Sequence, residues 1–79
     1  MREFLKILRK EENVRLIQKL NYNQVKYNNA FDLMYKYNCK DESTRYNLNL
    51  YLSNMNKIKQ VLEERNIQIQ FLNGWEIIY

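Results

Sequence analysis

The feature that most constrains the fold is a change of hydrophobic period late in the chain. From the capping residues Asp41 or Ser43 to Arg65 no Gly or Pro interrupts the sequence, and apolar side chains recur at helical spacing. These apolar residues fall on one helix face: Leu48, Tyr51, Leu52, Met55, Ile58 and Leu62. After Arg65 the apolar residues alternate with polar ones, and Asn73-Gly74, a strong signal for a tight turn, divides the alternating stretch in two. The sequence therefore predicts a long amphipathic helix followed by a C-terminal β-hairpin with strands over 67–71 and 75–79.

The first half of the chain also shows helical spacing, in three stretches. Residues 1–9 and 11–20 each carry apolar side chains at helical intervals, but one straight helix through both would scatter these side chains around its axis. We therefore expect a break near Lys10–Asn13. A third helical stretch covers roughly 25–37, and the Asn residues around it favour turns and caps, which leaves its start open. The segment 38–42 is then the turn before the long helix.

Length and composition limit the class of protein. A chain of 79 residues, 46% of them hydrophobic, is expected to form one packed domain over 1–79. No apolar run approaches the ~20 residues that a membrane span needs, and charges interrupt the N-terminal stretch, so we expect neither a span nor a signal peptide. The single cysteine, Cys39, fits a reducing compartment and is interpreted as a loop or half-buried residue. We expect a cytoplasmic protein.

The residues required for most catalysis are missing from the sequence. There is no His, a single Gly, and no aspartate besides Asp32 and Asp41. His-based nucleophile pairs are impossible, and neither a Gly-rich phosphate loop nor a Cys-x-x-Cys metal site can be formed. The sequence predicts no enzyme, no metal and no cofactor.

Two spacings in the last part of the chain match a known family. Tyr51, Met55, Ile58 and Leu62 are spaced as V-x-x-x-I-x-x-L-x-x-x-L, and Gly74, Trp75 and Ile77 match the end of G-x-G-Y-x-L. These segments resemble the end of the winged helix-turn-helix DNA-binding domain of OmpR-type proteins. The family's first wing glycine is replaced by Leu72, its adjacent Arg by Asn73, and its basic residue before the last core position by Val61. The resemblance implies a mostly α fold of winged helix-turn-helix type.

The same resemblance implies how the domain meets double-stranded DNA. The long helix would enter the major groove, and the hairpin would flank it as a wing that touches the backbone. Asn can pair with adenine, and Arg or Lys with guanine or phosphate. The residues predicted to contact DNA are Arg45, Tyr46, Asn49, Ser53, Asn56, Lys57, Lys59, Asn73 and Gly74. Each also fits a plain structural role, as a solvated helix face or as a turn.

Charge supports an anionic partner. The chain carries 13 Lys and Arg against 9 acidic residues, a net charge of +4. A further set of N-terminal cations can add phosphate contacts, although Glu3, Glu11 and Glu12 interleave with them: Arg2, Lys6, Arg9, Lys10, Arg15 and Lys19. We expect a sequence-specific DNA binder, such as a small transcriptional regulator or a phage or plasmid accessory factor. One copy would bury little DNA surface, so homodimeric or tandem binding is expected.

The alternative is a protein-interaction module with the same fold, such as an inhibitor of a host protein encoded by a phage or mobile element. Tyr is enriched at protein interfaces, and five tyrosines would suit this role: Tyr22, Tyr27, Tyr35, Tyr37 and Tyr46. Binding of single-stranded RNA ranks last, because it needs aromatic side chains on a sheet and only one hairpin is predicted.

Overall fold

The computed structural model describes residues 2–38 and 40–78 and confirms a mostly helical chain with a C-terminal β-hairpin. The elements are α1 (Arg2–Lys10), α2 (Asn13–Tyr35), α3 (Glu42–Glu64), β1 (Gln68–Phe71) and β2 (Trp75–Ile78). Cys39, and Tyr79 at the end of the predicted second strand, lie outside the described residues. Within the described part, no helix combines the length and the apolar character that crossing a membrane requires.

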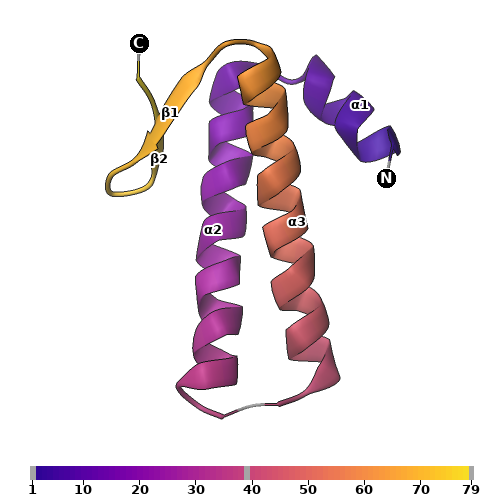
Figure 1. Cartoon of the computed structure of the whole chain (residues 1–79), viewed down its shortest axis with the longest axis vertical. Helices are drawn as coiled ribbons and strands as arrows, with labels where there is room; N and C mark the ends of the chain where they lie inside the picture. Colours follow the sequence, from indigo (N-terminus) through magenta and orange to yellow (C-terminus); the bar gives the residue numbers. More distant parts are fainter. Residues whose placement is uncertain (1, 39, 79) are drawn as a thin grey trace.

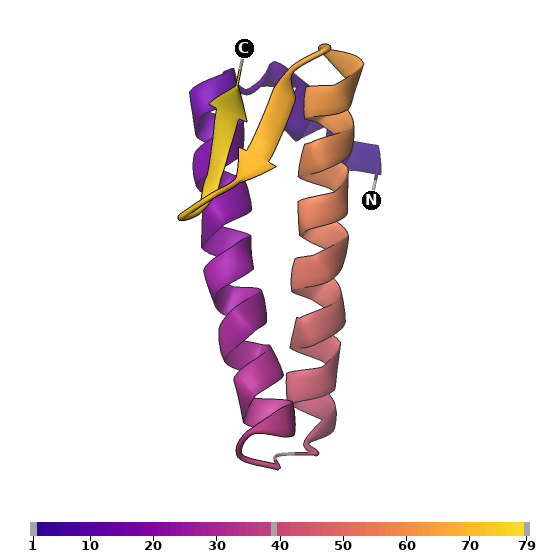
Figure 2. The same cartoon turned by 60° about the vertical axis from the view of Figure 1, so that its left-hand side comes forward.

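Helices α2 and α3 form the body of the molecule. They lie side by side and antiparallel, with the β-hairpin on one side of the pair and α1 on the other (Figures 1 and 2). The resulting molecule is a thin slab with principal extents of 39 × 30 × 15 Å. Because α1 and the hairpin both attach at the same end of the pair, the other end consists of two helices alone (Figure 1).

The first half of the chain follows the prediction at one point and departs from it at another. The break is confirmed, since α1 ends at Lys10 and α2 begins at Asn13. Most of the separately predicted stretches 11–20 and 25–37 lies instead in one continuous helix, α2, which begins at Asn13 and ends at Tyr35. Asn23, inside this helix, does not form a turn because its amide has helical and tertiary partners: Nδ2 donates to the Lys19 carbonyl at 2.7 Å, and Oδ1 accepts from Asn54 Nδ2 at 3.2 Å. Tertiary contacts here outweigh the modest helix propensity of Asn.

Helix α3 begins and ends as local chemistry dictates. Asp41 is the N-cap, and its carboxylate accepts a hydrogen bond from the Ser43 amide at 3.3 Å. At the other end Asn66 adopts a left-handed φ of 59°. The amides of Asn66 and Ile67 then donate to the carbonyls of Glu63 and Leu62, which satisfies the last turn in the manner of a Schellman motif. This sharp ending directs the chain from α3 straight into β1.

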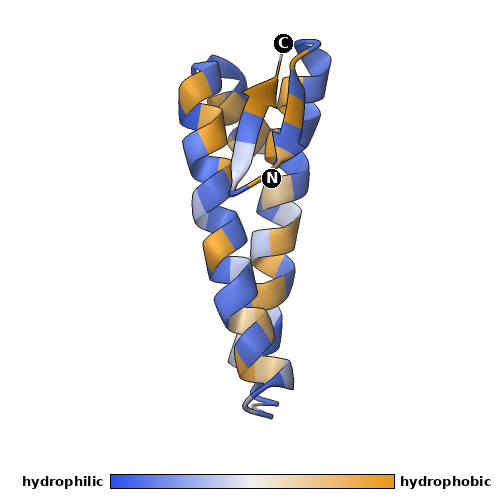
Figure 3. Cartoon of the chain, turned by 90° about the vertical axis from the view of Figure 1, so that its left-hand side faces the viewer, coloured by the Kyte–Doolittle hydropathy of each residue, from blue (hydrophilic) through white to orange (hydrophobic). Residues whose placement is uncertain are grey.

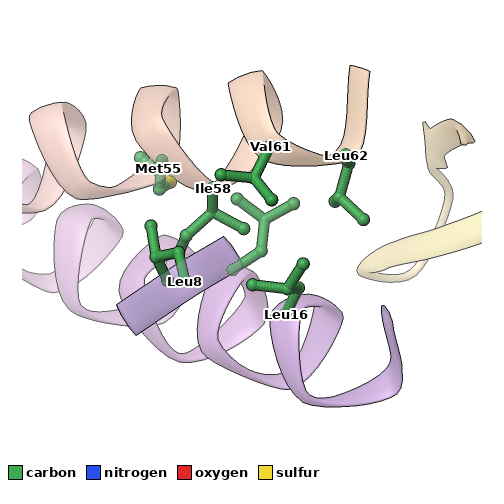
Figure 4. Packing of buried hydrophobic residues seen from close by; sticks show 7 residues of the cluster. Leu8, Leu16, Met55, Ile58, Val61 and Leu62 are labelled. Atoms are coloured by element: carbon green, nitrogen blue, oxygen red, sulfur yellow. The ribbon is translucent and has the colours of Figure 1, made fainter. Parts of the chain in front are cut away.

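The hydrophobic core occupies only the end of the slab where all the elements meet. Its buried side chains come from three helices (Figure 4): Leu8, Leu16, Leu20, Met55, Ile58, Val61 and Leu62. Met55, Ile58 and Leu62 were predicted to lie on the core face of α3. Leu48 and Tyr51, however, are only half-buried and Leu52 is 42% exposed. These three residues lie nearer the other end of α3, where neither α1 nor the hairpin covers the helices.

The hairpin packs one face on the helices. Its strands pair antiparallel, with Ile69 opposite Ile77 and Phe71 opposite Trp75. Ile69 and Trp75 pack against the core, and Phe71 meets Trp75 edge to face with 5.4 Å between ring centroids. The hairpin thereby extends the core by one thin layer over the helix pair.

Candidate nucleic-acid interface

Four of the predicted DNA-contacting residues of α3, together with Gln60, form a row on its outer side. We define the α3 ridge as Arg45, Asn49, Ser53, Asn56 and Gln60. At about 100° per residue these positions share the sector that points away from α2. Arg45, Asn49, Asn56 and Gln60 are exposed, and Ser53 is half-buried. The Ser53 hydroxyl accepts a hydrogen bond from Lys57 Nζ at 3.2 Å. The structure thus brings these five side chains together on an uncovered surface.

Lys57 and Lys59 flank this ridge on opposite sides around α3. Two residues of helix turn the side chain through about 200°, and the contacts agree with this difference. Lys57 Nζ lies 5.9 Å from the centre of the Phe4 ring in α1, and Lys59 Nζ lies 4.3 Å from the centre of the Trp75 ring in β2. Both side chains are half-buried through these contacts. The two cations flank the ridge and do not merge into one patch.

The remaining predicted residues are not all close to the ridge. Tyr46 is 67% exposed, near the N-terminal end of α3. Asn73 and Gly74 form the hairpin tip, which lies against α2: with Asn21, Gln24 and Phe71 among other residues they line an open cavity of about 330 Å³. The hairpin tip is therefore separated from the α3 ridge by the width of the helix pair.

Two residues that the sequence interpretation missed hold the hairpin in this place. Asn21 Oδ1 accepts a hydrogen bond from the Trp75 amide at 2.6 Å, and Asn21 Nδ2 donates to the Trp75 carbonyl at 3.0 Å. Gln24 Oε1 accepts from the Trp75 indole Nε1 at 3.1 Å. A Cβ at Gly74, where φ is 152°, would lie 3.2 Å from Asn21 Oδ1, so this close approach favours glycine. The sequence signals this role only by an Asn at a helical position, and an Asn on a solvated helix surface gives the same signal.

Charges at the two ends of the ridge are mixed. Glu42 lies in the first turn of α3, and Glu63 and Glu64 in its last. Glu64 is paired with Arg9 of α1, with 3.0 Å between Oε2 and Nη2, and the hydrogen bond from Arg9 lowers the pKa of Glu64. This pair offsets one of the two acids at the C-terminal end.

Some of the N-terminal cations are exposed, and others form ion pairs within the chain. Lys6, Lys10 and Arg15 are exposed. Lys19 pairs with Glu11 at 3.0 Å, and Arg9 pairs with Glu64, so these two have protein partners. The side chain of Arg2 lies outside the described part of the structure. The strongest candidates for added phosphate contacts are thus the exposed cations of α1 and the start of α2.

Comparison with protein-family models, with curated proteins and with solved structures found no match for this chain. Among residues 2–38 and 40–78, no three His, Cys, Asp or Glu side chains are grouped so that they could hold a metal ion. Any inference about function therefore rests on the geometry of the α3 ridge and of Lys57 and Lys59 beside it.

Proposed function

We propose that the chain is a sequence-specific double-stranded DNA-binding protein that places the α3 ridge in the major groove. The hairpin meets that helix through Trp75, over which Lys59 lies, while its tip lies against α2, so Asn73 and Gly74 are not proposed as DNA contacts. The observation that carries the proposal is the uncovered row of Arg45, Asn49 and Asn56 with a lysine on each side. Such a protein would act in the cytoplasm as a small transcriptional regulator or a mobile-element accessory factor.

The dimensions of the ridge suit base recognition. Asn49 and Asn56 are seven residues apart, so they share a helix face and are separated by about 10 Å along the axis. This separation equals about three base-pair steps of 3.4 Å. The two amides would read adenines, and Arg45 would pair with guanine or phosphate. Lys57 and Lys59 would each face one phosphate backbone, because the two backbones border the groove on opposite sides.

The α2–α3 pair departs from a conventional helix-turn-helix. The two helices of that motif cross at about 90–120°, whereas α2 and α3 run antiparallel along their length (Figure 1). The DNA proposal therefore depends on α3 and its flanking lysines, and α2 serves mainly as support for α3 and for the hairpin.

Salt dependence of duplex binding tests the proposal. A duplex selected from a random pool would be labelled, and its affinity for the full chain measured by fluorescence anisotropy. With phosphate contacts from Lys57 and Lys59, and a third if Arg45 pairs with phosphate, log K should fall with log salt with a slope of about −1.8 to −2.7, so affinity should fall roughly 12- to 40-fold between 50 and 200 mM. Absence of binding at low salt would rule the proposal out.

A matched pair of variants locates the contact surface. Arg45→Glu and Lys26→Glu change the net charge equally, but Lys26 lies on α2, where its ammonium is 5.5 Å from the centre of the Tyr22 ring. Arg45→Glu should weaken binding by at least ~10-fold, the loss of one base or phosphate contact, whereas Lys26→Glu should have only a small long-range effect. Equal losses would indicate attraction by net charge alone.

A specific observation favours the second candidate, a protein-interaction module that docks on a host protein. Four tyrosines are strongly exposed: Tyr22 at 61%, Tyr35 at 65%, and Tyr37 and Tyr46 at 67% each. Exposed tyrosines with apolar neighbours are typical of protein interfaces. Failure to bind any duplex at low salt would favour this candidate.

A further inference from the structure

Half of the α2–α3 pair has almost no core of its own. We define the distal half as residues 24–35 of α2 and 42–54 of α3. Within these ranges the buried residues are Ala30 and Thr44, while the large buried side chains all belong to the opposite end. Helices of about 12 residues are marginal in water without tertiary packing. The distal half therefore has little packing within one chain to hold it together.

On α2, an aromatic row extends below the hairpin. Gln24, which accepts the hydrogen bond from the Trp75 indole, marks the side of α2 that faces the hairpin. Phe31 and Tyr35 follow seven and eleven residues later and so lie within about 20° of the same side. Their rings are 4.5 Å apart between centroids, and they are 43% and 65% exposed. The row thus continues the hairpin side of the slab as an exposed aromatic surface.

On α3 and the hairpin, further apolar side chains continue this surface. Leu52 is seven residues before Lys59, whose ammonium lies over Trp75, so Leu52 faces the hairpin side as well. Leu52 is 42% exposed, and Phe71 and Leu72 at the end of β1 are 51% and 54% exposed. Figure 3 shows this side of the molecule, with the hairpin over the upper part of the helices and the distal half bare below it. We call Phe31, Tyr35, Leu52, Phe71 and Leu72 the apolar face.

We infer that the apolar face is the interface of a homodimer with two-fold symmetry. Because a large apolar side chain presents about 200 Å² when fully exposed, these exposed fractions leave roughly 500 Å² of the five side chains in water. A standard interface buries about 800 Å² per partner, of which about 60% is apolar, so it needs roughly 500 Å² of apolar surface. The apolar face therefore supplies, at most, the apolar area of one standard-size interface.

The shape of this side also fits a second copy. The hairpin lies over one end of this side and leaves the distal half of the helices uncovered (Figure 3). A two-fold axis that lies in the plane of the apolar face and runs across the helices inverts one copy relative to the other, which sets the hairpin end of each against the distal half of its partner. The distal helices of each copy then gain the packing that they lack alone. The α3 ridge borders this interface, because Leu52 lies one helical turn from both Asn49 and Asn56. The inference is nevertheless argued from the apolar face alone and does not rest on DNA binding.

Sedimentation analysis of the full chain tests this assignment. Over a concentration series from about 1 to 300 µM the mass should rise towards twice the 9.9 kDa of one chain. Phe31→Asp should raise the dissociation constant by at least ~100-fold, because it places a charge at the centre of the interface.

The matched control is Leu33→Asp, since Leu33 is 46% exposed on the same helix and about 200° away from Phe31. Leu33→Asp should remain dimeric. A wild-type chain that stays monomeric over the whole series, or equal dissociation in the two variants, overturns the inference. If circular dichroism shows that Phe31→Asp is unfolded, the sedimentation mass of Leu52→Asp is the test instead. That variant should be a folded monomer, and a folded dimer would contradict the assignment.

Discussion

Replacement of Asn21 by alanine would test how the hairpin is held to the helix pair. The Asn21 amide makes two hydrogen bonds to the backbone of Trp75, at 2.6 and 3.0 Å, across a sequence separation of 54 residues. Each such bond contributes about 1 kcal/mol net, so losing both costs about 2 kcal/mol. The higher helix propensity of alanine stabilises α2 by about 0.5 kcal/mol and offsets part of this loss. The expected change in unfolding free energy is therefore a loss of about 1.5 kcal/mol.

This loss is large for a chain of this size. A domain of 79 residues is expected to have a total stability of about 4–12 kcal/mol. The corresponding fall in Tm is about 6–12 °C. Trp75 is the chain's single tryptophan, so its emission reports directly on the position of the hairpin. In Asn21→Ala we expect emission at longer wavelength, because the indole becomes more exposed to water.

The matched control is Asn29→Ala, which removes an exposed Asn from the same helix. It should be neutral or slightly stabilising, with unchanged Trp75 emission. Both variants would be measured by urea unfolding, followed by circular dichroism and by fluorescence. If their unfolding free energies agree within about 0.5 kcal/mol, a difference typical of surface substitutions, apolar packing alone holds the hairpin and the reasoning fails.

Two further substitutions test the core and the α1–α3 contact. Ile58→Ala should lower the free energy of unfolding by about 3 kcal/mol in urea, because Ile58 is fully buried in the core cluster. The control is Val14→Ala, at a side chain that is 62% exposed, which should change the free energy of unfolding by less than about 0.5 kcal/mol. Glu64→Gln should lower stability at neutral pH. The hydrogen bond from Arg9 lowers the pKa of Glu64 in the folded state below that of an unfolded glutamate. This stabilisation is therefore present above the unfolded pKa and is lost as pH falls through the folded pKa. The stability difference between wild type and Glu64→Gln should therefore vanish at strongly acid pH, and a difference that persists there would refute the assigned ion pair.

The elements of this protein were largely predictable because their causes are local. The capping of α3 at Asp41, the break after Lys10, and the Asn73-Gly74 turn each depend on a few neighbouring residues. The change from helical to alternating periodicity near Arg65 located the hairpin for the same reason. The polar row from Arg45 to Gln60 also follows from helical geometry alone.

Other features depend on which segments meet in space, and local patterns do not contain this information. The asparagines of α2 looked like turn residues, but Asn21 and Asn23 bond to partners 54 and 31 positions away and remain helical. Leu52 matched the core spacing as well as Ile58, yet Ile58 is buried and Leu52 is exposed, because α1 and the hairpin both pack at the same end of the helix pair. Sequence periodicity determined which side of α3 is apolar, whereas tertiary packing decided how far along that side the core extends.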